Sequence, residues 1–145
     1  MAHFLVVEDF PPMAALVATA IRREGHSVLR AGSVAKALSL GDVFDYAVLD
    51  VDLPDGDGIQ LATQLLNEDR VESIVFFTAC RDADMLTGAA RIGLVIDKTA
   101  GYDCLMAAIR QVTAPKMAMQ VAVGGSPTPV TTQASSRSGT RRKVD

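Results

Sequence analysis

Polar residues that suit phosphate chemistry follow four apolar runs of the sequence. Glu8 and Asp9 follow the first run, Asp50 the third, Thr78 the fourth, and Lys98 comes shortly after the fifth. Carboxylates held close together repel one another, and a hard cation such as Mg²⁺ or Mn²⁺ relieves that repulsion. A carboxylate can attack phosphorus to form an aspartyl phosphate while a metal, an ammonium and a hydroxyl neutralise the transferred group. These residues therefore predict a metal-dependent phosphoryl transfer to an aspartate.

Asp50 fits the role of phosphoacceptor best within this set. It directly follows the apolar residues 46–49, which predict a buried central strand. We expect Thr78 and Lys98 to neutralise the charge of the group transferred to Asp50, because the residues that follow the parallel strands converge on one edge of the sheet. The turn-rich residues 50–58 then lead into a helix.

The elements that must position these residues are short apolar strands alternating with helical stretches. This alternation predicts a doubly wound, five-stranded parallel sheet of the (βα)5 flavodoxin-like α/β class, with right-handed crossovers. In such a sheet, ligands bind at the carboxyl ends of the strands, where the polar residues converge. Strands are predicted over 3–7, 27–31, 46–49, 73–77 and 94–96. Helices are predicted from the prolines at 11 and 12 up to the stop at Gly25, and over 34–40, 59–67, 82–91 and 101–112.

The length and composition indicate one globular domain rather than a multidomain enzyme. The chain has 145 residues, 49% hydrophobic and 21% charged. Its two cysteines have no metal-ligand spacing, and we expect both to be thiols in a reducing compartment. The first ten residues lack the basic start and the long apolar run of a signal peptide or membrane span. We therefore expect a cytoplasmic protein that does not use a membrane as a partner.

The charge divides the chain into an acidic body and a basic tail. Residues 1–114 carry 9 Lys and Arg against 16 Asp and Glu, whereas residues 115–145 carry 5 against 1. An acidic body repels nucleic-acid phosphates, so we do not expect nucleic-acid binding. The segment 115–145 is rich in Ser, Thr, Gly and Pro, and we predict a disordered tail.

The joint order of these motifs resembles the receiver domains of two-component response regulators. The matching features are the acidic pair Glu8 and Asp9, the stretch Asp-x-x-x-Pro-x-x-x-Gly over 50–58, Thr78-Ala79, and Lys98. The resemblance spans residues 1–114. It implies a stand-alone receiver in a phosphorelay, which takes a phosphoryl group from a histidine kinase or phosphotransfer protein and signals to a downstream protein by contact. Such a domain is not an enzyme apart from catalysing its own phosphorylation and dephosphorylation.

The resemblance also implies a role for each site residue. Asp50 would be the phosphoacceptor and, together with Asp9, a direct ligand of Mg²⁺ or Mn²⁺. Glu8 would hold the metal through water, and Asp52 would contribute its backbone carbonyl. The hydroxyl and the ammonium, Thr78 and Lys98, would bind the phosphoryl oxygens.

Three departures from the receiver pattern cluster around Lys98. Receivers place an aromatic residue three positions before this lysine, where this chain has Val95. The stretch 93–98 is about two residues shorter than is usual for receivers. Thr99 stands where many receivers have a proline after a cis bond, and because a cis bond before a non-proline residue costs about 3 kcal/mol, we expect a different loop geometry.

Two alternative functions are open. The first is a phosphorylation-independent receiver-like scaffold, which Val95 and the shortened loop would suit. The second is a phosphatase similar to the haloacid dehalogenase superfamily, whose nucleophile and acid have the spacing of Asp50 and Asp52. That family needs an acidic pair after the lysine, and only Asp103 and Asp145 follow Lys98 here. Because the acidic pair stands before the nucleophile, we favour the receiver.

Overall fold

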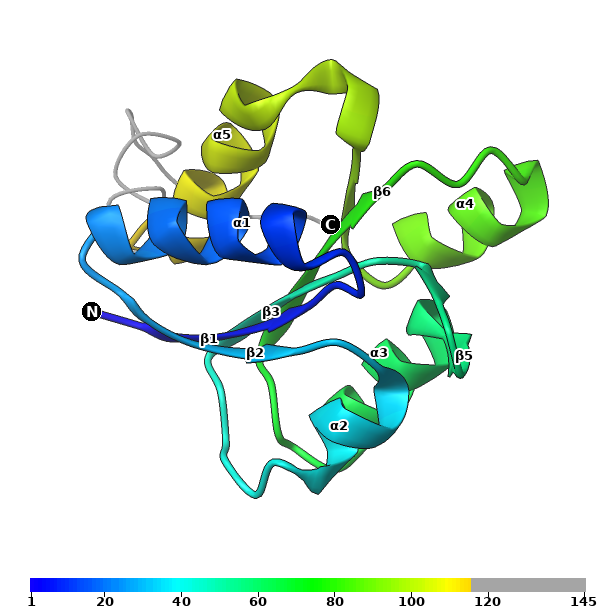
Figure 1. Ribbon diagram of the computed structural model, residues 1–145, viewed down its shortest axis with the longest axis horizontal. Helices are drawn as coiled ribbons and strands as arrows, with labels where there is room; N and C mark the ends of the chain where they lie inside the picture. The colour runs from blue at the N-terminus through cyan, green and yellow to red at the C-terminus, as the bar shows by residue number, and fades with distance from the viewer. Residues whose placement is uncertain (116–145) are drawn as a thin grey trace, which may run out of the picture. The chain divides into compact units, whose positions relative to one another are not determined.

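Residues 1–115 of the computed structural model form an α/β unit around one parallel sheet (Figure 1). The strand order is β2-β1-β3-β6-β7, and every neighbouring pair is parallel. The strands are β1 (His3–Val7), β2 (Ser27–Ala31), β3 (Tyr46–Leu49), β6 (Ser73–Thr78) and β7 (Leu94–Asp97). The helices are α1 (Pro11–Arg23), α2 (Val34–Ser39), α3 (Gly58–Asn67), α4 (Ala83–Ala90) and α5 (Tyr102–Thr113). This confirms the predicted five-stranded, doubly wound fold.

Helices cover both faces of the sheet, as Figure 1 shows, with α1 and α5 on one face and α2 and α3 on the other. Alternate residues of each central strand therefore enter different apolar clusters, because successive side chains of a strand point to opposite faces. One cluster contains Leu5, Leu49 and Phe76 together with Leu61 and Leu65 of α3. The other contains Phe4, Val6, Val48 and Val75 together with Ile21 of α1 and Ile109 of α5.

Side-chain caps fix where the helices begin at the carboxyl edge of the sheet. The Oγ of Ser33 accepts a hydrogen bond from the backbone N–H of Lys36 at 3.1 Å at the start of α2. The carboxylates of Asp57 and Asp82 cap α3 and α4 in the same manner. None of the helices within residues 1–115 is long and apolar enough to span a membrane.

The turn-rich stretch after β3 contains a short antiparallel hairpin that the sequence analysis did not predict. Its strands are β4 (Asp52–Leu53) and β5 (Gly56–Asp57). A short 3₁₀ helix, η1 (Lys98–Ala100), likewise follows β7. The predicted disorder of residues 115–145 falls outside the described residues except for Pro115, so it stays a prediction, as does the domain boundary at 114.

The outer strand β7 is less buried than its neighbour β6. All four of its residues are half-buried, whereas five of the six residues of its neighbour β6 are buried.

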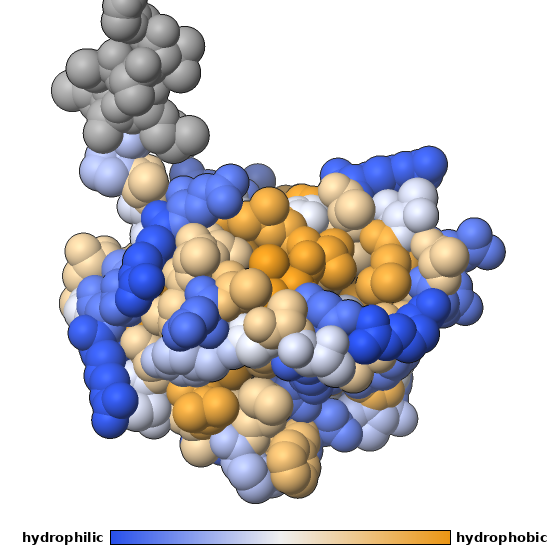
Figure 2. All heavy atoms as spheres, turned by 90° about the horizontal axis from the view of Figure 1, so that it is seen from above, coloured by the Kyte–Doolittle hydropathy of each residue, from blue (hydrophilic) through white to orange (hydrophobic). Residues whose placement is uncertain are grey.

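Figure 2 views the molecule from above relative to Figure 1. On the face seen in this view, apolar side chains gather among hydrophilic ones. The domain therefore keeps apolar surface outside its two core clusters.

Candidate functional site

The predicted site residues come together at the carboxyl edge of the sheet. Glu8 and Asp9 follow β1, Asp50 follows β3, Thr78 is the last residue of β6, and Lys98 follows β7. Because β1, β3, β6 and β7 are consecutive neighbours in a parallel sheet, their carboxyl ends lie side by side. The strand order thus places residues up to 90 positions apart in the sequence at one site.

Asp50 lies at the centre of this site with both carboxylate oxygens hydrogen-bonded. The Oγ1 of Thr78 donates to Oδ1 at 2.7 Å, and the Nζ of Lys98 donates to Oδ2 at 2.7 Å. The backbone N–H of Asp52 also donates to Oδ1, at 3.2 Å. Asp50 and Thr78 are buried, with exposed fractions of 6% and 1%. A hydroxyl and an ammonium therefore face the carboxylate that the sequence selects as the acceptor.

Lys98 also bridges two carboxylates. Its Nζ lies 2.7 Å from Glu8 Oε1 as well as from Asp50 Oδ2. Burial lowers the pKa of Lys98, but the hydrogen bonds to Asp50 and Glu8 outweigh it, and the pKa is raised. Burial raises the pKa of Glu8 even though Lys98 and the backbone of Phe10 donate to its carboxylate. Lys98 is thus held in its charged form, while Glu8 is protonated more readily than a carboxyl in water.

Three carboxylates at this edge have the arrangement of a metal site. Glu8, Asp9 and Asp50 each offer one oxygen, and these oxygens lie within 4.8 Å of one another. Asp9 is exposed, while the other two are buried. A donor set made only of carboxylate oxygens suits a hard divalent cation such as Mg²⁺. The side chain of Asp52 is exposed, and the part predicted for its backbone carbonyl stays a prediction.

Gly58 has a physical reason to be glycine. Its backbone N–H donates to the carbonyl of Val51 at 2.8 Å, which brings the start of α3 against the end of β3. A Cβ at Gly58 would lie 1.9 Å from the backbone oxygen of Asp50. The Gly at the end of the Asp-x-x-x-Pro-x-x-x-Gly stretch therefore lets α3 begin directly beside the acceptor.

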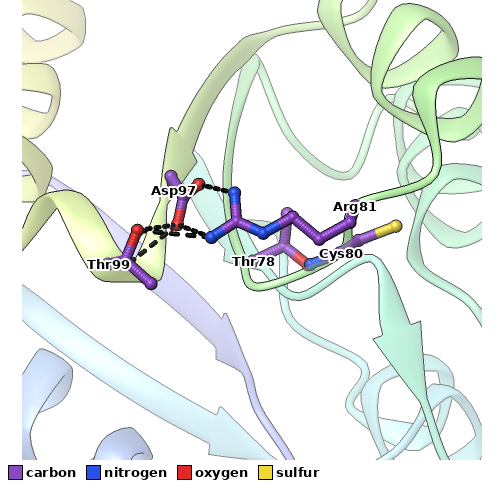
Figure 3. Close-up of polar contacts among 5 residues, drawn as sticks. All are labelled: Thr78, Cys80, Arg81, Asp97 and Thr99. Carbon is purple, nitrogen blue, oxygen red and sulfur yellow. Dashed lines mark hydrogen bonds and ion pairs between the residues drawn. The ribbon is translucent and has the colours of Figure 1, made fainter.

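A second polar cluster, which the sequence analysis missed, joins Arg81 to Asp97 and Thr99, the residues on either side of Lys98 in the sequence (Figure 3). Arg81 forms an ion pair with Asp97, and its Nη2 lies 3.4 Å from the Oγ1 of Thr99. The backbone N–H and the hydroxyl of Thr99 each donate to Asp97 Oδ1 at 2.7 Å. These two hydrogen bonds and the arginine hold the pKa of Asp97 below its ordinary value. The only feature of the sequence that could have indicated this cluster is the acidic Asp97 next to Lys98, and it did not identify Arg81 as the partner.

The departures from the receiver pattern lie in this same region. Val95 is half-buried in β7 and pairs in register with Phe76 of β6. Within residues 1–115 no peptide bond is cis, so the bond before Thr99 is trans and lies within η1. The consequences of Val95 and of the short stretch 93–98 for signalling stay predictions.

Comparison with known proteins identifies a family for most of the chain. The profile of the family described as response regulator receiver domain matches residues 4–110. The transcriptional regulatory protein TcrA of Mycobacterium tuberculosis is 39% identical over 103 residues, which are 70% of this chain and 36% of TcrA. The transcriptional regulatory protein DpiA of Escherichia coli is 36% identical over 94 residues, 62% of this chain and 42% of DpiA. The chain therefore corresponds to less than half the length of these relatives.

Solved structures with the same fold include receiver domains and a response regulator. The non-phosphorylated HemR receiver domain of Leptospira biflexa has a TM-score of 0.71 at 24% identity, covering 79% of this chain and 96% of that one. The response regulator TrrA of Thermotoga maritima, solved in complex with Mg(2+)-BeF, has a TM-score of 0.68 at 21% identity, covering 77% and 99%. At these identities the likeness establishes the fold.

Proposed function

The chain belongs to the response regulator receiver domain family, and from this we propose that Asp50 accepts a phosphoryl group from a phosphohistidine donor in a Mg²⁺-dependent reaction. Receiver domains belong to phosphorelay signalling and are not classical enzymes. The observation that carries the proposal is the buried carboxylate of Asp50 between the hydroxyl of Thr78 and the ammonium of Lys98, each at 2.7 Å.

In the proposed reaction, an oxygen of the Asp50 carboxylate attacks the phosphorus of the donor. The new O–P bond forms as the P–N bond of the phosphohistidine breaks, and the bonding electrons remain on the imidazole nitrogen, which takes up a proton. Thr78 contacts one carboxylate oxygen of Asp50 and Lys98 contacts the other. Each side chain therefore needs only a small shift to reach an oxygen of the attached phosphoryl group. The burial of Thr78 and the partial burial of Lys98 favour this role, because charge stabilisation is stronger away from water.

The metal would be held by the acidic residues of the same edge. We assign Asp9 and Asp50 as direct ligands of Mg²⁺ or Mn²⁺, Glu8 as a ligand through water, and Asp52 as a ligand through its backbone carbonyl. The bound ion would supply positive charge that offsets the repulsion between the acidic cluster and the incoming phosphoryl oxygens. Lys98 contributes part of this neutralisation itself, because its ammonium contacts both Glu8 and Asp50.

The phosphorylated domain would pass the signal on by protein contact. Attack of water on the phosphorus would release inorganic phosphate and restore the carboxylate of Asp50, which ends the signal. Phe10, directly before α1, and Leu16 within α1 are exposed, with exposed fractions of 58% and 51%. Apolar side chains so close to the site suit the docking of a histidine kinase or phosphotransfer protein, and a downstream protein would bind elsewhere on the domain.

Neither alternative function is favoured by the family assignment. A phosphatase of the haloacid dehalogenase type requires an acidic pair after the lysine, and the acidic cluster of this domain is built from residues before it, Glu8 and Asp9, together with Asp50. A scaffold that does not use phosphorylation gives no reason for a hydroxyl and an ammonium to converge on one carboxylate, as Thr78 and Lys98 do on Asp50.

Intact-mass spectrometry tests the proposal. The full chain is incubated with Mg²⁺ and acetyl phosphate and quenched in acid, in parallel with Asp50→Asn and the control Asp84→Asn, which alters an exposed aspartate of α4. We expect one added phosphoryl group on the native chain and on the control. The adduct should be absent from Asp50→Asn and from samples with a chelator. An adduct that persists on Asp50→Asn would contradict the proposal, as would the absence of any adduct on the native chain.

A further inference from the structure

Arg81 ties the loop after β6 to the residues on both sides of Lys98. Its guanidinium pairs with Asp97, the residue before Lys98, and reaches Thr99, the residue after it (Figure 3). We call these contacts of Arg81 with Asp97 and Thr99 the arginine bridge. It connects the two chain segments that carry Thr78 and Lys98, the groups that hold Asp50.

The far end of the arginine bridge is firmly anchored. The carboxylate of Asp97 is held by the backbone N–H and the hydroxyl of Thr99, each at 2.7 Å. Asp97 is also the register partner of Thr78 in the β6 and β7 pair. The loop thus leaves β6 at Thr78 and is tied back, through Arg81, to the residue beside Thr78 on the neighbouring strand.

The near end of the loop is tied to the site itself. The backbone N–H of Cys80 donates to the Oγ1 of Thr78 at 3.2 Å, and that same hydroxyl donates to Asp50 at 2.7 Å. Cys80 directly precedes Arg81. The short loop is therefore held at one end by the hydroxyl of Thr78, which is bonded to Asp50, and at the other by the carboxylate of Asp97 on β7.

We propose that Arg81 is a positioning residue that resists the movement of Thr78 when Asp50 is phosphorylated. This inference rests on the proposed function. A phosphoryl group attached to Asp50 requires the hydroxyl of Thr78 to exchange the carboxylate for a phosphoryl oxygen. The N–H of Cys80, bonded to that hydroxyl, draws the loop along with it, and Arg81 is pulled against its anchor on Asp97. The arginine bridge therefore favours the unphosphorylated arrangement.

An arginine close to an anion-binding site could instead attract the phosphodonor. This alternative predicts the opposite change in the phosphorylation rate when Arg81 is removed. If Arg81 attracted an anionic donor, its removal would raise the donor concentration needed for half-maximal rate and slow the reaction. If the arginine bridge resists rearrangement, its removal speeds the reaction at saturating donor and leaves half-saturation unchanged. The geometry favours resistance, because the guanidinium is already paired with a carboxylate.

The test measures the initial rate of Asp50 phosphorylation by acetyl phosphate against donor concentration, using the full chain and Mg²⁺. In this reaction the Asp50 oxygen bonds to phosphorus as the bond from phosphorus to the acetyl oxygen breaks, and acetate leaves with the electron pair. The variants are Arg81→Ala, Arg81→Lys and the control Arg91→Ala, which alters an exposed arginine at the end of α4. The side chain of Arg81 is 64% exposed, so its removal should not prevent folding.

We expect Arg81→Ala to raise the maximal rate about two- to fivefold, the range that a partly exposed ion pair supports. Arg81→Lys, which keeps the charge but loses the forked contact with Asp97 and Thr99, should give a smaller increase. Arg91→Ala should match the native chain. An unchanged or reduced maximal rate for Arg81→Ala, or a change confined to half-saturation, would overturn the inference. If the native chain took no phosphoryl group, the proposed function would fail and the inference with it.

A double-mutant cycle shows whether Arg81 acts through Asp97. Asp97→Asn weakens the ion pair, while the amide oxygen can still accept the hydrogen bonds of Thr99. Residues that act through one contact give non-additive effects. We therefore expect Asp97→Asn alone to raise the maximal rate, and Arg81→Ala to add little in that background. Fully additive effects of the two substitutions would exclude the arginine bridge as the cause.

Discussion

The neighbouring strands β6 and β7 lead to the two groups that hold Asp50, Thr78 at the end of β6 and Lys98 directly after β7, yet the surroundings of the two strands are very different. Strand β6 is buried from its second residue to its end, and Thr78 at that end has an exposed fraction of 1%. Strand β7 is half-buried throughout, and the side chain of Asp97 at its end is 35% exposed. Packing on both faces dictates the conformation of β6, whereas β7 lies at the edge of the sheet and is less constrained. The departures of this chain from the receiver pattern all lie on or beside β7.

The carboxylates of the two regions differ in the same way. Burial raises the pKa of Glu8 at the interior side of the site. Hydrogen bonds from Thr99 and the ion pair with Arg81 lower the pKa of Asp97 at the edge. In the interior, the ionised carboxylate of Glu8 therefore lowers the stability of the folded domain. Perturbed groups of this kind are common where a site is built for binding or catalysis. The edge holds a charge that adds stability. In the proposed function the interior would supply the chemistry, and the less constrained edge would adjust it.

The largest expected difference is in the free energy of unfolding after substitution of Phe76 on β6 or of Val95, its register partner on β7. Phe76 is fully buried, so Phe76→Ala leaves a cavity and should lower the free energy of unfolding by about 3–5 kcal/mol. Val95 is half-buried, and Val95→Ala should cost about 1 kcal/mol. Urea unfolding followed by circular dichroism measures both values, since the chain contains no tryptophan for fluorescence. Similar losses for the two variants would contradict the distinction between interior and edge.

The interior of the molecule was also the part that the sequence predicted best. Continuous apolar runs such as 46–49 and 73–77 identify buried strands, and parallel pairing then requires Asp50 and Thr78 to lie together. The arginine bridge could not be predicted, because Arg81 and Asp97 meet only through the path of a loop between distant elements. The raised pKa of Glu8 was equally hidden, since it depends on burial in the folded domain. The roles assigned to the site residues still rest on the family resemblance.

A second contrast compares two threonine hydroxyls. Thr78→Val keeps the shape of the side chain but removes the donor to the buried Asp50 and the acceptor for Cys80, which should cost about 1.5–3 kcal/mol. Thr99→Val removes a hydroxyl that donates to Asp97 at the exposed edge, and should change stability by about 0.5 kcal/mol or less. Urea unfolding in metal-free buffer measures both. If Thr99→Val proved the more damaging substitution, the edge would be as constrained as the interior.

The smallest expected effect concerns how the stability of the folded domain depends on pH. Glu8 and Asp97 should contribute to this dependence with opposite signs. The pKa of Glu8 is raised above its ordinary value of 4.5, so the folded state binds this proton more tightly than the unfolded state. Its ionisation therefore costs stability at neutral pH, and the cost disappears as the pH falls through the raised pKa towards 4.5. Glu8→Gln should thus raise the midpoint of thermal unfolding at pH 7 in chelator-treated buffer, and this gain should shrink on acidification.

Asp97 should show the opposite behaviour. Its pKa is lowered from an ordinary value of 3.8, so its ionised form stabilises the folded domain above that pH, and the contribution is lost as the pH falls through the lowered pKa. Asp97→Asn should therefore lower the midpoint at pH 7 and approach the native value in strong acid. Because this carboxylate is partly exposed, 0.5 M NaCl should reduce the deficit of Asp97→Asn more than the gain of Glu8→Gln. If both variants shifted the midpoint in the same direction at pH 7, the two carboxylates would not mark the contrast between interior and edge, and the freedom of β7 to adjust the site would need another basis.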